Sequence, residues 1–164
     1  MAKRLDGPYR LGYIRPYHSP ALARLFQSAL DQDFSYYSDS YLNQTRRQNT
    51  APKLALGSLR PDRMLIGLWS DDSLVGYIIG ATRPGEDSGD IFWLYVEPEH
   101  RGRGLGADLL MESVGWLQQK GLKSVELVTY DHAEFYKKHN FNLERVAKGF
   151  IGGQYVYILK WSLL

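Results

Sequence analysis

The spacing of apolar residues in the first third of the chain predicts a strand followed by a helix. The segment "YRLGYIRPY" (9–17) is a candidate strand that ends at Pro16. Leucines at helical spacing in "ALARLFQSAL" (21–30) predict a helix, and Pro20 lies in its first turn. Segment 31–50 is polar and aromatic with no clean period, which leaves room for a second helix.

Dense apolar runs in the middle of the chain predict buried strands. The runs "RMLIGLW" (63–69) and "LVGYIIG" (74–80) are joined by the polar residues "SDDS", a pattern typical of a β-hairpin. A polar loop at 83–89 follows. The next run, "DIFWLYV" (90–96), is apolar at successive positions, so we expect a central strand that is buried on both faces.

A change of period after this strand predicts a helix and then another strand. Residues 105–120 have a helical stripe, and Gly121 is placed to end the helix; the stripe consists of Leu110, Val114 and Leu117. The run "SVELVT" (124–129) reads as the following strand. The pattern of 90–129 is therefore a strand–helix–strand crossover, whose two strands are expected to be parallel.

The last quarter of the chain predicts a short helix and a terminal hairpin. Asp131 and Glu134 have the spacing of a capping box, and Asn140 suits the left-handed conformation at a helix end. The segments "FNLERVA" and "QYVYILKW" predict two strands around the turn "KGFIGG". The whole order indicates a mixed α/β fold with antiparallel hairpins at both ends, in one domain of residues 1–164.

The link before the predicted helix of residues 105–120 is rich in glycine. In "HRGRGLGADLL", the positions where a Ser, Thr, Asp or Asn would cap the helix are Gly or Arg. Unpaired N–H groups at a helix start, next to two arginines, suit a phosphate or pyrophosphate. We therefore interpret 101–107 as an anion-binding loop. A tight turn with solvated arginines is the simpler alternative, and neither a P-loop nor a GxGxxG spacing is present.

Composition excludes several classes of function. The chain has 164 residues, no cysteine and a net charge of +2. It therefore forms no disulfide or thiolate metal site and has no cysteine nucleophile, and its charge does not favour nucleic acid or a membrane as partner. The four histidines lack metal-ligand spacing, so no metal is expected. The basic N-terminus leads into no apolar stretch, which favours a cytoplasmic protein without a signal peptide.

The stretch "WLYVEPEHRGRGLGADLL" (93–110) resembles motif A of the GNAT superfamily, the acyl-CoA-dependent N-acyltransferases. The segment "HAEFYKKHNF" (132–141) is similar to the Phe-Tyr segment that this family carries after the next strand, although the family often has Asn at the position of Thr129 and Gly at that of Asn140. The resemblance covers most of the chain in the same order. It implies a central mixed sheet of about seven strands with about four helices.

The resemblance also assigns roles to residues. Backbone amides of the glycine loop would hold the pyrophosphate of acetyl-CoA, and the edge of the preceding strand would pair with pantetheine. The loop residues are Arg101, Gly102, Arg103, Gly104, Leu105, Gly106 and Ala107, and the strand residues are Leu94, Tyr95 and Val96. Tyr136 matches the family's general acid, which protonates the departing thiolate, and Tyr130 lies nearby.

The base and the acceptor site are less determined by the pattern. Glu97 directly follows the central strand and is the candidate base, acting through water; a solvated loop carboxylate is the alternative. Glu126 lies inside the next strand, where alternation is expected to turn it away from the cleft. Acidic and aromatic residues that suit a cationic amine occur in "DQDFSYYSDSY", and we assign the acceptor to Asp33, Phe34, Tyr36 and Tyr37.

The sequence thus predicts an N-acetyltransferase that moves the acetyl group of acetyl-CoA to a primary amine on a small molecule or peptide. Attack would be direct, through a tetrahedral intermediate, with no covalent enzyme intermediate and no metal. The alternatives are an acyl-CoA-binding sensor on the same fold and a different α/β enzyme that binds a nucleotide. A homodimer is possible through the aromatic strand "QYVYILKW".

Overall fold

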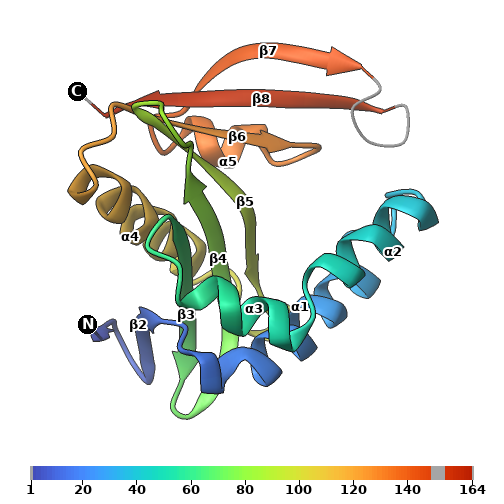
Figure 1. The fold of residues 1–164 in the computed structure, drawn as a ribbon, viewed down its shortest axis with the longest axis vertical. Helices are drawn as coiled ribbons and strands as arrows, with labels where there is room; N and C mark the ends of the chain where they lie inside the picture. The colour runs from blue at the N-terminus through green and yellow to red at the C-terminus, as the bar shows by residue number, and fades with distance from the viewer. Residues whose placement is uncertain (1, 149–153, 164) are drawn as a thin grey trace.

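The structure, a computed structural model, describes residues 2–148 and 154–163. These form one twisted eight-stranded sheet flanked by helices, in the spatial order β1-β2-β3-β4-β5-β6-β8-β7 (Figure 1). The strands are β1 (Ala2–Arg4), β2 (Tyr9–Tyr13), β3 (Arg63–Ser70), β4 (Ser73–Thr82), β5 (Ser88–Val96), β6 (Ser124–Thr129), β7 (Asn142–Lys148) and β8 (Tyr155–Ser162). The mixed α/β class is confirmed, and β1 is the strand that the pattern did not predict.

Every neighbouring pair of strands is antiparallel except β5 and β6. That parallel pair confirms the predicted crossover through the helix between them. The last strand, β8, lies between β6 and β7, so both of its backbone edges are paired within the chain. The outer strands of the sheet are β1 and β7. The predicted turn at 148–153 falls largely outside the described residues.

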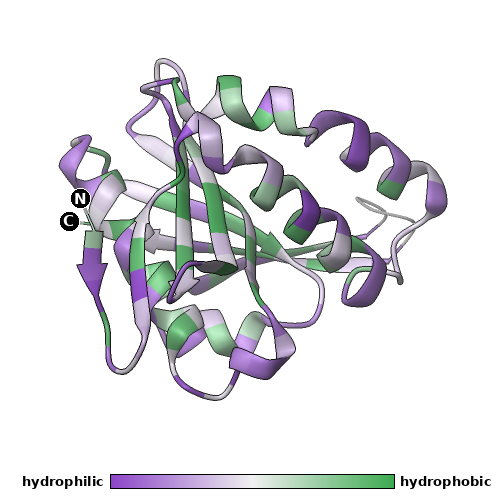
Figure 2. Ribbon diagram, turned by 90° about the horizontal axis from the view of Figure 1, so that it is seen from below, coloured by the Kyte–Doolittle hydropathy of each residue, from purple (hydrophilic) through white to green (hydrophobic). Residues whose placement is uncertain are grey.

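Five helices surround the sheet, one more than the expected number. They are α1 (Ser19–Gln32), α2 (Asp39–Gln48), α3 (Ala51–Ser58), α4 (Leu105–Gln119) and α5 (Ala133–Lys137). The pattern missed α3 because this helix is only eight residues long and buries one apolar side chain, Leu54. Hydrophobic residues gather on the central strands, and more hydrophilic residues lie on the flanking helices (Figure 2).

Two apolar cores lie on opposite faces of the sheet. Ile78 packs into the core beneath α4, whereas its neighbours Tyr77 and Ile79 pack into the core beneath α1. Because side chains alternate between faces, a strand that is covered on both sides must be apolar at successive positions. This requirement explains the dense apolar runs of β3 and β4.

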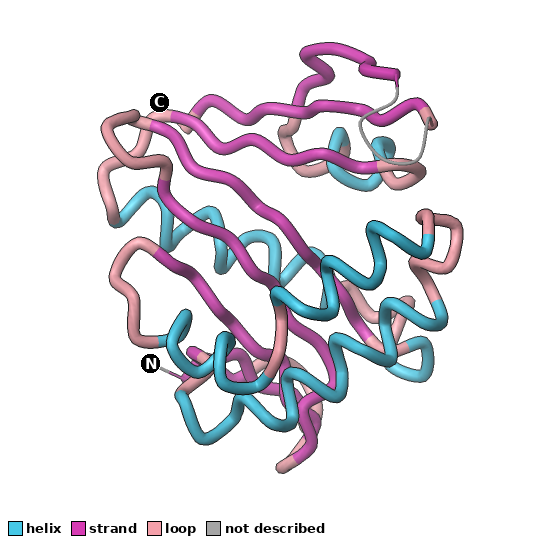
Figure 3. The backbone as a smooth tube through the Cα atoms, turned by 45° about the vertical axis from the view of Figure 1, so that its right-hand side comes forward, coloured by secondary structure: helices cyan, strands magenta, loops and turns pink. Residues whose placement is uncertain are grey.

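The strands β5 and β6 pair over only part of their length. Their register runs from Ser88 opposite Ser124 to Ile91 opposite Leu127, after which β6 pairs with β8 alone. On the other side of β5, Ile79 pairs with Trp93 and Gly80 with Ile91, so a bulge at Phe92 falls where the two strands part. The divergence is visible in Figure 1 and Figure 3. The middle of β5 therefore lines an opening, and the expectation of burial on both faces is wrong there.

The local start of α5 differs from the predicted capping box. His132 is the N-cap residue and no side chain caps the helix; the Thr129 hydroxyl accepts a hydrogen bond from the His132 backbone N–H at 3.2 Å instead. Asp131 lies one residue too early to cap. The helix ends at Lys137, and Asn140 has a φ of 69°, which confirms the left-handed position.

Candidate active site

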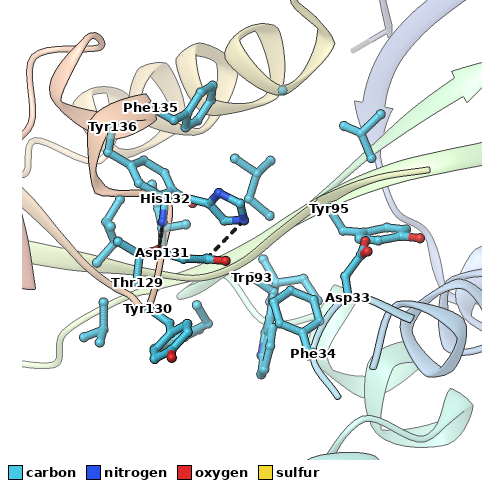
Figure 4. Close-up of a pocket in the computed structure, with 18 of the residues that line it drawn as sticks. Asp33, Phe34, Trp93, Tyr95, Thr129, Tyr130, Asp131, His132, Phe135 and Tyr136 are labelled. Carbon is cyan, nitrogen blue, oxygen red and sulfur yellow. Dashed lines mark hydrogen bonds and ion pairs between the residues drawn. The ribbon is translucent and has the colours of Figure 1, made fainter. Parts of the chain in front are cut away.

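A cleft of about 1500 Å³ occupies the opening between β5 and β6. One wall is the link between α1 and α2, and the opposite wall is the end of β6 with α5 (Figure 4). The start of α4 lies at one end. A single small-molecule site typically needs about 300–1000 Å³. The cleft is therefore large enough for two reactants bound together.

The glycine loop presents bare backbone to the cleft. Gly102 and Gly104 have φ values of 75° and 78°, and Gly104 is the N-cap of α4 with no side-chain cap. A Cβ built on Gly104 would meet no atom within 4 Å, so the space beside the loop is open. Of the seven predicted loop residues, all but Arg103 line the cleft. The N–H groups of the first turn of α4 have no intrahelical acceptors, as an anion site requires.

Arg101 joins this loop to the opposite wall. Its Nε donates to the carbonyl of Val96 at 2.7 Å, and its guanidinium forms an ion pair with the Asp33 carboxylate at the end of α1. The predicted acceptor residue Asp33 is thus brought to the predicted cofactor loop. Its charge is already balanced by Arg101.

The strand residues Leu94, Tyr95 and Val96 all line the cleft. The side chain of Tyr95 is buried against Tyr77 beneath α1, and burial and the charge of Asp33 raise its pKa. What this part of β5 offers to a ligand is mainly its backbone edge, which β6 leaves unpaired beyond Ile91. An extended chain can add to such an edge as an extra strand would.

Tyr136 faces the same cleft from α5. Its ring contacts Phe135 and Phe141 edge-on, at centroid distances of 5.0 and 5.9 Å. Burial raises the pKa of the Tyr136 hydroxyl, and the charge of Asp131 and the hydroxyl of Tyr37 raise it further. The hydroxyl therefore keeps its proton at neutral pH, as a general acid must.

The α1–α2 link supplies an aromatic wall. Tyr36 stacks on Tyr130 across the cleft at 4.6 Å and 24°, and it contacts Tyr37 at 4.5 Å. Phe34 packs edge-on against Trp93 at 5.4 Å. Burial is the largest cause of the raised pKa values of Tyr36 and Tyr37. The four predicted acceptor residues all line the cleft. It is also lined by Trp93, Tyr41 and Tyr130, which the sequence did not assign to the acceptor.

The positions of Glu97 and Glu126 relative to the cleft are the reverse of those expected from the sequence. Glu97 is not among the residues that line the cleft, and its Oε2 lies 4.0 Å from Nε2 of His100. Glu126, which we expected to face away, does line the cleft. Side chains do alternate along β6, and Val125 and Leu127 pack into the core beneath α4. The opposite face of β6, which carries Glu126, is the one that borders the cleft. That expectation is therefore wrong.

An arginine-centred network lies where β5 and β6 part. Arg83 binds the two oxygens of Asp90 at 2.8 and 2.5 Å and one oxygen of Glu126 at 2.9 Å. Lys160 approaches Glu126 at 3.7 Å. The hydrogen bond from Arg83 is the main cause of the lowered pKa of Glu126. These groups stabilise one another's charges and tie β4, β5, β6 and β8 together.

Two features of other classes are not found in residues 2–148 and 154–163. No group of three or more His, Cys, Asp or Glu side chains is placed to hold a metal ion. No helix there is long and apolar enough to cross a membrane.

The sequence and the fold have counterparts among known proteins. The sequence profile of the Acetyltransferase (GNAT) family matches residues 22–141. The chain therefore belongs to the GNAT acetyltransferase family. The crystal structure of the PaiA N-acetyltransferase from Thermoplasma acidophilum in complex with coenzyme A superposes with a TM-score of 0.78, at 20% identity, covering 94% of this chain and 98% of that one.

Two curated relatives are also similar in sequence. The Spermidine N(1)-acetyltransferase of Thermoplasma acidophilum is 24% identical over 119 residues, which are 66% of this chain and 71% of that protein. An uncharacterized N-acetyltransferase of Methanocaldococcus jannaschii is 33% identical over 66 residues, which are 38% of this chain. The match spans only 29% of the length of that second protein.

Proposed function

We propose that the protein transfers the acetyl group of acetyl-CoA to a primary amine by direct attack. One observation carries this proposal: the uncapped glycine loop, the open edge of β5 and Tyr136 all face one cleft. These are the three parts that such a transfer needs, namely an anion site, a binding edge for an extended chain and a proton donor.

The residues of the cleft fit acetyl-CoA as a substrate. The backbone amides of Arg101–Ala107 would bind its pyrophosphate, supported by the positive end of α4. Its pantetheine would pair with the backbone of Leu94, Tyr95 and Val96. The coenzyme A bound in the similar PaiA structure supports this assignment.

The chemistry follows from the groups available. A neutral amine attacks the thioester carbonyl, and a backbone N–H at the divergent strands stabilises the oxyanion. The sulfur leaves with the proton of Tyr136. No covalent enzyme intermediate is required, which is consistent with a chain that has no cysteine.

The acceptor side favours a cationic amine. Phe34, Tyr36 and Tyr37 form an aromatic wall, which attracts ammonium groups. The name of the spermidine acetyltransferase relative supports a polyamine as the first acceptor to test. In this assignment Asp33 does not bind the amine directly, because its carboxylate is paired with Arg101; the ion pair instead holds the acceptor wall in place. Glu97 stays a prediction for the general base. Its position outside the cleft argues against this role.

The decisive experiment follows free thiol release from acetyl-CoA with a panel of amines. The panel contains spermidine, spermine, a lysine peptide, a peptide with a free N-terminal alanine and an aminoglycoside. Because the chain has no cysteine, a thiol reagent reports coenzyme A alone. Release that requires one amine class would establish both the activity and the acceptor. Tight binding of acetyl-CoA with no release from any amine would identify the sensor instead.

A further inference from the structure

Four carboxylates line the cleft, and three of them are paired with one of two arginines. The four acidic residues among its described lining are Asp33, Asp90, Glu126 and Asp131. Asp33 is paired with Arg101, and Asp90 and Glu126 share Arg83. A carboxylate that already binds a guanidinium is a poor site for a second cation and a poor acceptor of its proton. Asp131 is the exception.

Asp131 lies two residues beyond the carboxyl end of β6, opposite the aromatic wall. Within residues 2–148 and 154–163 its carboxylate contacts the ring of His132, with Oδ1 and Nε2 3.2 Å apart, and no arginine or lysine is paired with it. About half of its side chain, 49%, is exposed, so a ligand in the cleft can reach it. Figure 4 shows this pair between Tyr136 on one side and Tyr130 on the other.

The cleft that Asp131 lines is also lined by Tyr36, Tyr37, Tyr130 and Tyr136. The negative charge of Asp131 contributes, after burial, to the raised pKa values of Tyr36, Tyr37 and Tyr136. Tyr130 is its neighbour in the chain and stacks on Tyr36. One carboxylate with several neutral hydroxyls is a suitable environment for an ammonium group, since each hydroxyl oxygen can accept an N–H.

We propose that Asp131 binds the ammonium group of the acceptor and removes its proton, and that His132 passes this proton to water. The inference rests on the proposed acetyltransferase activity and names the base for it. Asp131 is suited to the role because it lies in the cleft near the proton donor Tyr136, whereas Glu97 lies outside. His132 can complete the transfer, since 68% of its side chain is exposed.

The protons and bonds of this step balance. An N–H bond of the ammonium breaks and its proton goes to Asp131, which leaves a lone pair on the nitrogen. That lone pair forms the C–N bond to the acetyl carbon. As the C–S bond breaks, sulfur takes the proton of Tyr136, and a second proton from the nitrogen restores the Tyr136 hydroxyl. One proton leaves in each turnover, by way of His132.

Two acceptors of similar size test the proposal. Ethylamine is an ammonium ion at pH 7, whereas 2,2,2-trifluoroethylamine is largely neutral and needs no base before it attacks. We expect Asp131→Asn to lower kcat/KM for ethylamine by roughly 10²-fold and to affect trifluoroethylamine much less.

The matched control is Asp72→Asn, the same change at an exposed aspartate of the β3–β4 turn. It should leave both acceptors unaffected. Calorimetric titration with coenzyme A must give the same Kd for all variants, which shows that each is folded. His132→Asn should also slow ethylamine more than trifluoroethylamine.

Two results would contradict the inference while leaving the activity intact. One is an equal loss with both acceptors, which would make Asp131 a structural residue. The other is wild-type turnover of ethylamine by Asp131→Asn. If the wild type releases no thiol with these acceptors or any amine of the panel, the acetyltransferase proposal itself fails.

Discussion

The partly buried Tyr136 is the proposed proton donor of the reaction. If it protonates the leaving sulfur, Tyr136→Phe removes the proton and keeps the ring contacts with Phe135 and Phe141. We expect kcat to fall by roughly 10²-fold, with coenzyme A affinity unchanged. Stopped-time thiol release and calorimetry measure the two quantities. Tyr17→Phe is the control, since that tyrosine is 77% exposed and lies outside the cleft.

The raised pKa of Tyr136 also determines the pH range of this role. The usual tyrosine pKa is 10.0, and burial, with the charge of Asp131, keeps the hydroxyl protonated beyond that value. Ionisation of Tyr136 should therefore cause no loss of kcat as pH rises from 7 to 10. Above pH 10 the unfolded chain loses this proton first, so the folded state is destabilised there. Two results together would assign the proton to another donor. One is a wild-type kcat that falls with a midpoint below pH 9, and the other is a kcat of Tyr136→Phe equal to that of the wild type.

At the scale of elements, the bulge at Phe92 depends on a close contact between β4 and β5. A Cβ on Gly80 would lie 2.5 Å from the carbonyl oxygen of Asp90 and 2.8 Å from Cε of Met64. Gly80→Ala must therefore push the strands apart where the cleft begins. We expect a loss of about 2 kcal/mol of unfolding free energy, and weaker coenzyme A binding. Urea denaturation and calorimetry measure these effects.

The control at this scale is Gly57→Ala in α3. A Cβ there meets no atom within 4 Å, and alanine favours a helix, so we expect a gain of about 0.5–1 kcal/mol. A neutral result for Gly80→Ala would mean that the strands adjust without cost. The position of the bulge would then not explain the opening.

Sequence patterns predicted the elements that have strong periods and missed what depends on three-dimensional contacts. The runs that became β3 and β4 were recognisable because both faces of these strands are buried. The short helix α3 has too few turns to show a period. The bulge at Phe92 was also missed, because it arises from pairing with β4 and leaves no local signal in the sequence.

The candidate site shows the same division. The glycine loop was found because missing side chains are visible in the sequence. The ion pair between Arg101 and Asp33 joins residues 68 positions apart, so no local pattern could show that Asp33 is already neutralised. Asp131 resembled part of a capping box, and its place in the same cleft as Tyr136 became visible only in the folded structure, where α5 packs against β7 and β8.

For the whole molecule, the cleft predicts which ligands stabilise the folded state. A ligand that binds only the native protein raises its melting temperature. At a concentration one hundred times its Kd, coenzyme A should add about 2.7 kcal/mol, or roughly 5–10 °C in Tm. ATP and NAD should have little effect at equal concentration, because the loop lacks the P-loop and GxGxxG spacings. Equal stabilisation by NAD or ATP would favour the nucleotide-dependent enzyme.

A matched pair of glycine substitutions assigns this shift to the loop. Gly104 and Gly85 both have positive φ, at 78° and 76°, and a Cβ on either meets nothing within 4 Å. Glutamate at both positions therefore imposes a similar backbone strain, but only the side chain at Gly104 projects beside the anion site and adds negative charge there. We expect Gly104→Glu to abolish the coenzyme A shift and Gly85→Glu to retain it. An undiminished shift in Gly104→Glu would place the pyrophosphate away from α4, and the open edge of β5 would then have to bind the coenzyme without help from the loop.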